Sequence, residues 1–138
     1  MEVDGVICRL FISDISGKDD YDVLVQESIE NADGFILAYS MLDLDSFTET
    51  RALHRRITHA KRQSRSSRNG IAIVATRLDE VSERKVFEGP GYSFAANNGC
   101  DFFACSAKTG QNVDAAFMAV VRALRARAGE GKSKEHTM

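Results

Sequence analysis

The chain has 138 residues, of which 43% are hydrophobic and 28% are charged, and its formal net charge is −2 at pH 7. This length fits one domain, and the composition is that of a globular protein that can fill a hydrophobic core. The near-neutral charge argues against nucleic acid as a partner, and the longest apolar runs are strand-sized, so neither a signal peptide nor a membrane-spanning helix is predicted.

The three cysteines are Cys8, Cys100 and Cys105. Their odd number and the lack of metal-ligand spacing argue against a disulfide framework or a zinc site. They are expected to be small buried hydrophobes in a reducing compartment. The sequence therefore predicts a cytoplasmic protein, or one held peripherally at the inner face of the plasma membrane.

In the first half of the chain, short apolar runs typical of strands alternate with amphipathic stretches typical of helices. The patterns predict a strand over 7–12, a helix over 21–32, a strand over 35–39 and a helix from about Phe47. Ser46 is the expected N-cap of this helix, because Glu49 completes a capping box. The basic residues on and after it predict a solvated face, or alternatively a docking patch for an acidic partner: Arg55, Arg56, Lys61, Arg62, Arg65 and Arg68.

The second half predicts a strand over 71–75, a helix that restarts near Pro90, a strand over 101–105 and a helix over 113–128. Gly99 is a plausible C′ residue for the helix that begins near Pro90.

This alternation predicts an α/β domain over residues 1–128, with a mostly parallel sheet covered by helices on both faces, and a flexible polar tail over 129–138. In such sheets ligands bind outside the carboxyl ends of the strands. The polar residues that follow the strands are therefore the candidate site.

Each predicted strand is followed by side chains that could contact a ligand. Residues 14–17 follow the first strand, Ser40 the second, 76–79 the third and 106–108 the fourth. Asp and Ser at any one of these places are also typical of turns and helix N-caps. Their order and spacing together indicate one ligand-binding rim.

Three of these segments resemble the motifs of Ras-like small GTPases. DISGKDDY at 14–21 resembles the D-x-x-G switch segment, TRLD at 76–79 resembles the N-K-x-D guanine motif, and CSAK at 105–108 contains the S-A-K motif unchanged. The similarity runs in order and spacing from Val3 to about Arg127. It implies a Ras-like G domain of the P-loop NTPase fold, and a switch in signal transduction that binds GTP or GDP with Mg²⁺.

The resemblance also implies a role for each matching residue. Asp14 would reach Mg²⁺ through water, and Gly17 would offer its backbone N–H to the γ-phosphate. Asp79 would accept hydrogen bonds from two guanine donors, which adenine lacks. Ala107 would donate its N–H to the guanine oxygen and Lys108 would pack over the base. The remaining guanine-binding positions are Thr76, Arg77 and Ser106.

The sequence also departs from the family pattern. It contains no G-x-x-x-x-G-K-S/T phosphate loop, and it lacks the first strand, the first helix and the switch threonine, so GTP binding and hydrolysis by this chain are expected to be weak or absent. Lys18 stands at the catalytic Gln position but has no amide to orient water. Thr76 and Arg77 replace the Asn and Lys of the guanine motif, which changes their reach and geometry. Glu135 stands where a prenylated Cys would be, so no such anchor is encoded.

Two origins fit these departures: a truncated gene product or a degenerate family member. The leading hypothesis for function is a monomeric GTP-binding signalling switch that is impaired in this chain, with effectors or regulators contacting residues 18–32. The alternative is a pseudo-GTPase interaction module that binds no nucleotide. A receiver-type phosphoacceptor would use Asp14, Thr76 and Lys108 but leaves Asp79 and Ser106 unexplained.

Overall fold

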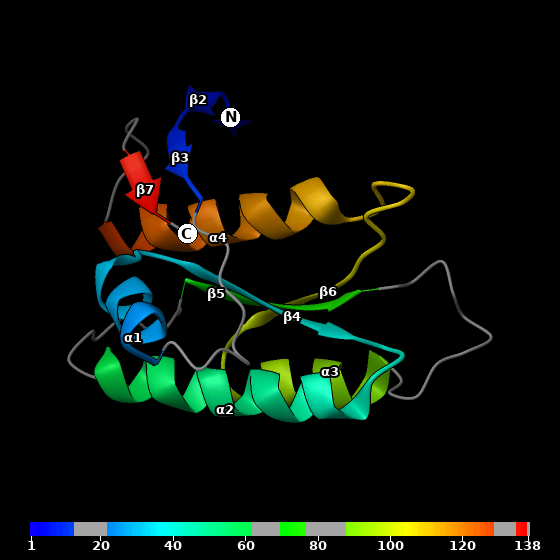
Figure 1. Cartoon of the computed structure of the whole chain (residues 1–138). Coiled ribbons are helices and arrows are strands. Elements are labelled where there is room, and N and C mark those ends of the chain that lie inside the picture. The colour runs from blue at the N-terminus through cyan, green and yellow to red at the C-terminus, as the bar shows by residue number, and fades with distance from the viewer. Residues whose placement is uncertain (13–21, 62–69, 77–87, 129–134, 138) are drawn as a thin grey trace.

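Three parallel strands form the centre of the fold. The computed structural model describes residues 1–12, 22–61, 70–76, 88–128 and 135–137. In these residues β4 (Phe35–Ser40), β5 (Ile71–Thr76) and β6 (Asp101–Ala104) form one sheet in the order β4-β5-β6. Helices α2 (Leu44–Ala60) and α3 (Glu88–Asn97) lie on one face, and α4 (Val113–Ala128) lies on the other (Figure 1). The predicted α/β class with helices on both faces is confirmed.

The central strand β5 is buried along almost its whole length, as its apolar sequence IAIVAT predicts. Its alternate side chains contribute to the two apolar layers of the sheet. Ile73 packs with Tyr39 and Phe47 in the layer under α2 and α3. Ala72 packs with Val120 in the layer under α4. Since β4 and β6 both pair in parallel with β5, the carboxyl ends of all three strands lie at one edge of the sheet.

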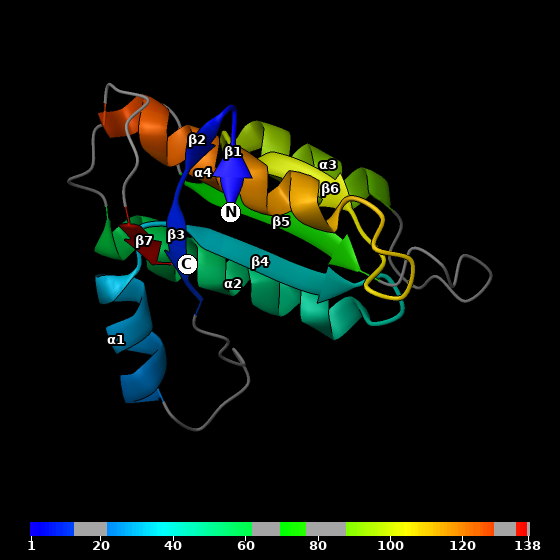
Figure 2. The ribbon, with the colours of Figure 1, turned by 90° about the horizontal axis from the view of Figure 1, so that it is seen from above.

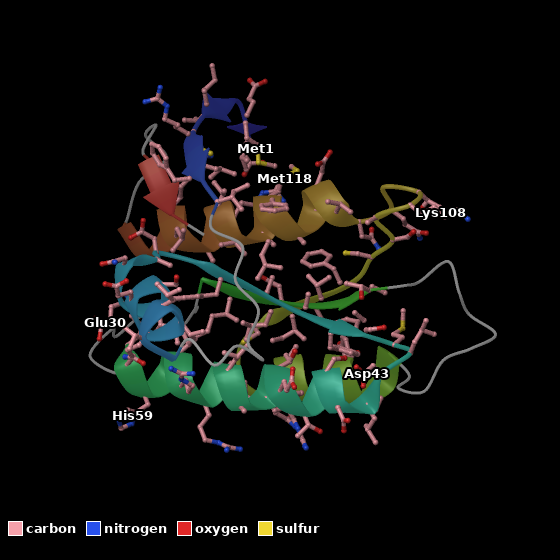
Figure 3. The ribbon with its side chains drawn as sticks, in the orientation of Figure 1. Met1, Glu30, Asp43, His59, Lys108 and Met118 are labelled. Carbon is pink, nitrogen blue, oxygen red and sulfur yellow. The ribbon has the colours of Figure 1, made fainter. Side chains whose placement is uncertain are left out.

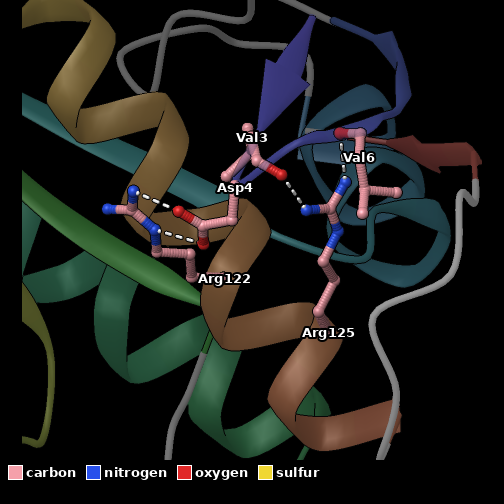
Figure 4. Close-up of polar contacts among 5 residues, drawn as sticks. All are labelled: Val3, Asp4, Val6, Arg122 and Arg125. Carbon is pink, nitrogen blue, oxygen red and sulfur yellow. Dashed lines mark hydrogen bonds and ion pairs between the residues drawn. The ribbon is translucent and has the colours of Figure 1, made fainter.

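The N-terminal hairpin of β1 (Glu2–Val3) and β2 (Val6–Ile7) is tied to α4 by two arginines (Figure 4). Asp4 and Gly5 form its turn with φ of 54° and 78°, the left-handed conformations that a two-residue type I′ turn requires. Arg122 makes a bidentate bond to the Asp4 carboxylate at 2.8 Å, which lowers the pKa of Asp4. Buried Arg125 donates to the carbonyls of Val3 at 2.6 Å and Val6 at 3.0 Å. These bonds join the hairpin to α4.

The strand predicted over 7–12 is instead divided at Cys8. The Cys8 N–H donates to the Met1 carbonyl at 2.8 Å, which extends the hairpin pairing beyond β2. After it, β3 (Arg9–Phe11) pairs in parallel with β7 (Glu135–Thr137) and not with the three-stranded sheet. Figure 2 shows β7 beside β3. The flexible tail predicted over 129–138 is thus wrong for Glu135–Thr137, whose polar residues carry no strand pattern.

Helix boundaries differ from the predictions at one clear point. The N-cap of α2 is Asp43, whose side chain accepts from the Asp45 N–H at 3.0 Å, and not Ser46. The Ser46 hydroxyl instead accepts from the Ser40 N–H and donates to the Asp43 carbonyl, so it fastens the first turn to the end of β4. A capping-box pattern cannot tell whether Ser46 is the N-cap or binds backbone groups from within the first turn. In both cases its hydroxyl lies near free backbone groups.

The C-terminus of α3 follows its predicted chemistry. Gly99 has φ of 68°, and the Cys100 N–H donates to the Ala95 carbonyl at 2.9 Å, as in a Schellman motif. Pro90 lies in the first turn of the helix, as expected. The expected burial is confirmed for Cys8 and Cys105, while Cys100 is partly buried and burial raises its pKa to about 11. Within the described residues, no helix combines the length and hydropathy that a membrane crossing needs.

A buried histidine makes stability depend on pH. The His54 side chain is 6% exposed, its ring lies 5.2 Å from that of Phe94, and its Nε2 has no hydrogen-bond partner in the described part of the chain. Burial lowers the pKa of His54 from 6.5. The unfolded chain then binds a proton more readily than the folded one, so stability is complete above pH 6.5 and decreases as the pH falls below it.

Replacing this histidine should remove that part of the pH dependence. We expect the free energy of unfolding to decrease less between pH 7.5 and pH 5.5 in His54→Leu than in the wild type, as measured by urea unfolding at both pH values. His59→Leu on the exposed side of the same helix is the control and should keep the wild-type dependence. Equal slopes in His54→Leu and the wild type would contradict the assignment.

Candidate functional site

The carboxyl ends of the three sheet strands bring Ser40, Thr76 and the residues after Ala104 to one rim. Ser40 at the end of β4 pairs in register with Thr76 at the end of β5, and Ala75 pairs with Ala104 at the end of β6. The arrowheads of β4 and β5 point to the same edge in Figure 2. The ends of β5 and β6 therefore lie side by side at this edge.

Thr76 is held by the sheet itself. Its hydroxyl donates to the Tyr39 carbonyl at 3.1 Å, and its own carbonyl accepts from the Met41 N–H at 3.3 Å. A hydroxyl has one proton to donate and two lone pairs to accept. Thr76 can therefore still accept a hydrogen bond from a ligand or neighbour, but its donor is already used. An Asn amide would offer both kinds of group at this position.

The loop after β6 is fixed by hydrogen bonds around Ser106. The Cys105 N–H donates to the Ala75 carbonyl at 2.7 Å, which continues the pairing of β6 with β5 by one residue. Ser106 is 1% exposed, and its hydroxyl accepts from the Thr109 N–H at 3.2 Å. Its carbonyl accepts from the Gly110 N–H at 2.8 Å. The buried serine therefore closes a tight turn over residues 106–110.

The next two residues of this turn face solvent. Ala107 and Lys108 are exposed, and Figure 3 shows the Lys108 side chain extending away from the sheet. No hydrogen bond is formed by the Ala107 N–H within the residues that the structure describes. A backbone N–H held at a fixed place can donate to the edge of a flat polar ring. An exposed aliphatic stem beside it can cover the face of the same ring.

One residue that positions this loop was not found from the sequence. Asn112 has φ of 62°, and its side-chain amide donates to the Ala104 carbonyl at 2.7 Å. It thereby joins the far end of the loop to the last residue of β6. The available signal was an Asn placed between Gly110 and the helix start, since Asn tolerates the left-handed conformation better than most residues.

Several predicted site residues lie outside the described part of the chain. These are Asp14, Gly17, Lys18, Arg77 and Asp79. Their roles toward Mg²⁺, phosphate and guanine stay predictions. Among the described residues, no cluster of His, Cys, Asp and Glu side chains could hold a metal ion. The described site thus consists of Thr76, Ser106, Ala107 and Lys108.

A groove of about 460 Å³ lies away from this rim, between α1 (Asp22–Asn31) and α2. It is lined by Val23, Gln26, Glu27, Glu30 and Arg56. Figure 3 shows Glu30 and Lys108 at opposite ends of the molecule. The groove therefore belongs to the segment predicted to contact partner proteins and not to the candidate nucleotide site.

Comparison with known proteins agrees with the motifs. The model of the Ras family matches residues 1–126. The chain is 32% identical to the protein named ras-2 of Neurospora crassa, over 95% of this chain and 64% of that protein. It is also 32% identical to Ras-like protein 1 of Pyricularia oryzae, over 89% of this chain and 57% of the relative, and to Ras-related protein R-Ras of Mus musculus, over 89% and 55%. The chain thus spans less than two thirds of the length of these relatives.

Proposed function

This chain belongs to the Ras family, and we propose that it recognises the base of a guanine nucleotide at the rim formed by the segments after β5 and β6. The observation that supports this most directly is the Ser106 turn. It holds the free N–H of Ala107 and the exposed Lys108 next to the end of β5. Asp79 follows that strand end by three residues.

In this proposal each residue contacts a different part of the base. Asp79 accepts two hydrogen bonds from guanine, Ala107 donates one to the guanine oxygen, and the Lys108 stem covers the ring. Ser106 acts through the turn that it closes, because its hydroxyl is already bonded to the Thr109 N–H. Thr76 and Arg77 take the places of the first two residues of the guanine motif and support the loop that carries Asp79.

We propose that the segment after β3 would bind phosphate and Mg²⁺. The Gly17 N–H would donate to the phosphate, and Asp14 would bind Mg²⁺ through water. A carboxylate oxygen is a suitable donor to Mg²⁺, directly or through water. The chain has no phosphate-loop motif, so most backbone donors to the phosphates are missing from it. We therefore propose a guanine-nucleotide signalling switch whose GTP binding and hydrolysis are impaired in this chain, and which is monomeric and either cytoplasmic or peripheral to the plasma membrane.

Weak binding is the first expected result. Isothermal titration calorimetry of this chain with GTP and Mg²⁺ should show no binding in the micromolar range, because the phosphate cradle is absent. A chimera that carries the phosphate-loop segment of a Ras-family relative ahead of Met1 is the positive control and should bind. Sub-micromolar binding by the unmodified chain would contradict the proposed impairment, whereas a silent chimera would contradict base recognition itself.

Slow hydrolysis of GTP by the chimera is the second expected result. A lysine ammonium donates hydrogen bonds but accepts none, so Lys18 cannot orient an attacking water as an amide does. In single-turnover assays, the Lys18→Gln chimera should hydrolyse bound GTP faster than the parent chimera. Rates that agree within a factor of about two, a barrier difference of ~0.4 kcal/mol, would show that Lys18 is not limiting.

The alternative is an interaction module that binds no nucleotide, and one observation favours it. Helix α1 exposes Val23 at 74% and Leu24 at 51%, next to the groove against α2. Exposed apolar side chains beside a groove are typical of contacts between proteins. Capture of a partner by the nucleotide-free chain, lost in Leu24→Asp and unaffected by added guanine nucleotide, would favour the module over the switch.

A further inference from the structure

The outer surface of α2 carries a line of basic side chains that the proposed nucleotide site does not use. Arg51, Arg55 and His59 follow one another at intervals of four residues and are all exposed; we name them the α2 basic stripe. Four residues advance a helix by slightly more than one turn, so the stripe runs about 12 Å along one side. Figure 3 shows His59 on the side of α2 that faces away from the sheet, at the opposite end from Asp43.

Neighbouring cationic side chains of α2 form hydrogen bonds within the fold. Arg56 donates to the Gln26 side chain at 3.4 Å, and Lys61 donates to the Glu30 carbonyl at 3.0 Å. Both contacts join α2 to α1. On α4, Arg122 is neutralised by Asp4 in a bidentate pair. The fold therefore supplies acceptors to cations that hold its elements together.

Among the residues that the structure describes, none provides such an acceptor to the side chains of the stripe. The Arg51 guanidinium lies 5.3 Å from the centre of the Phe47 ring, which orients it without neutralising its charge. The Arg55 carbonyl accepts from the Thr58 hydroxyl at 3.1 Å, but the Arg55 guanidinium has neither a hydrogen bond nor an ion pair with any other residue that the structure describes. An arginine presents five donors in a planar fork that matches carboxylates, so two arginines one turn apart form a surface complementary to carboxylates at similar spacing.

The charges at the other end of α2 restrict what can cover the stripe. Asp45 is exposed, about 9 Å along the helix from Arg51, and Glu49 lies between them. A bilayer or a polynucleotide presents negative charge over a wide area and would be repelled by these carboxylates and by the net charge of −2. A protein segment can confine its acidic residues to the length of the stripe. We propose that the α2 basic stripe docks an acidic segment of a partner protein.

The test uses the full chain and a fluorescein-labelled twelve-residue peptide with Glu at every third or fourth position, and measures anisotropy at low salt. Arg51→Glu/Arg55→Glu should weaken binding at least tenfold, and Arg55→Glu alone by a smaller factor. The matched control for Arg55→Glu is Arg9→Glu, which changes the net charge equally on another exposed part of the surface and should bind as the wild type does. Circular dichroism establishes that each variant is folded.

Three outcomes would overturn the proposal. The first is no binding of the peptide by the wild type, and the second is equal weakening in the stripe and control variants, which indicates general electrostatic attraction. The third is stripe-dependent binding of vesicles that contain 30% phosphatidylserine, or of a single-stranded oligonucleotide, without binding of the peptide. That result would assign the stripe to a membrane or to nucleic acid.

Discussion

Gly91→Ala should destabilise the fold, although the same substitution in an ordinary helix is stabilising. Gly91 lies in α3 with its Cα against the buried sheet. A Cβ there would collide with the Tyr39 hydroxyl, and would lie 2.9 Å from Tyr39 Cζ and 2.8 Å from Phe102 Cε1. Tyr39 is 1% exposed and cannot move aside. Overpacking of this kind costs about 1–3 kcal/mol, which outweighs the ~1 kcal/mol that Ala gains over Gly in a helix.

Gly89 offers a matched control in the same helix. A Cβ added there meets no atom within 4 Å, so Gly89→Ala should be neutral or stabilising by up to ~1 kcal/mol. Both variants are compared with the wild type by urea unfolding. Tyr39→Phe removes the hydroxyl, so Gly91→Ala should cost less in that background. If Gly91→Ala were as stable as Gly89→Ala, the close packing of α3 on the sheet would be wrong.

The elements predicted best from the sequence are those in which local pattern and tertiary packing agree. The last helix was predicted over 113–128, and α4 spans Val113–Ala128. Its apolar face is continuous, and no competing start or stop signal interrupts it. The three strands of the sheet were found to within one residue at each end, because each is a short apolar run bounded by polar residues.

Elements that depend on distant partners could not be predicted in the same way. The division of the first strand at Cys8 depends on the Met1 carbonyl, and the strand β7 depends on β3, more than 120 residues earlier. A sequence window around β7 does not contain β3, and the hydrogen bond to Met1, although local, leaves no mark in the hydrophobic pattern. The N-cap of α2 was missed for a more local reason, because Asp43 and Ser46 both fit the chemistry of a helix start.

In the candidate site, too, the residues could be predicted from local pattern, whereas their contacts with other elements could not. Ser106, Ala107 and Lys108 were placed from a tripeptide, and the structure adds how Ser106 and Asn112 fix the loop, which no motif states. Substitution of Thr for Asn at position 76 could be read from the sequence. The effect of this substitution on hydrogen bonding could not be predicted from the sequence. The bond from the Thr76 hydroxyl to the Tyr39 carbonyl depends on the register of β4 with β5.

Asp79→Ala should abolish the preference for guanine over adenine. A carboxylate that accepts from two donors of the base would be left unpaired by adenine, and sites of this kind reject the wrong ligand by roughly 10⁴-fold. The competition uses the chimera with a phosphate-loop segment, which we expect to bind nucleotide with measurable affinity. We expect its ratio of dissociation constants for ATP and GTP to fall from about 10⁴ to within tenfold of unity in Asp79→Ala, because the phosphates of both ligands bind equally.

Asp79→Asn separates the loss of a hydrogen-bonding pair from a general disturbance of the loop. An amide keeps one acceptor and gains a donor, which suits a base that carries a carbonyl in place of the guanine amino group. The Asn variant should therefore prefer xanthine nucleotides to guanine nucleotides in the same competition assay. Wild-type guanine selectivity in Asp79→Ala would refute the role of Asp79. Equal loss of all bases in both variants would assign Asp79 to the structure of the loop.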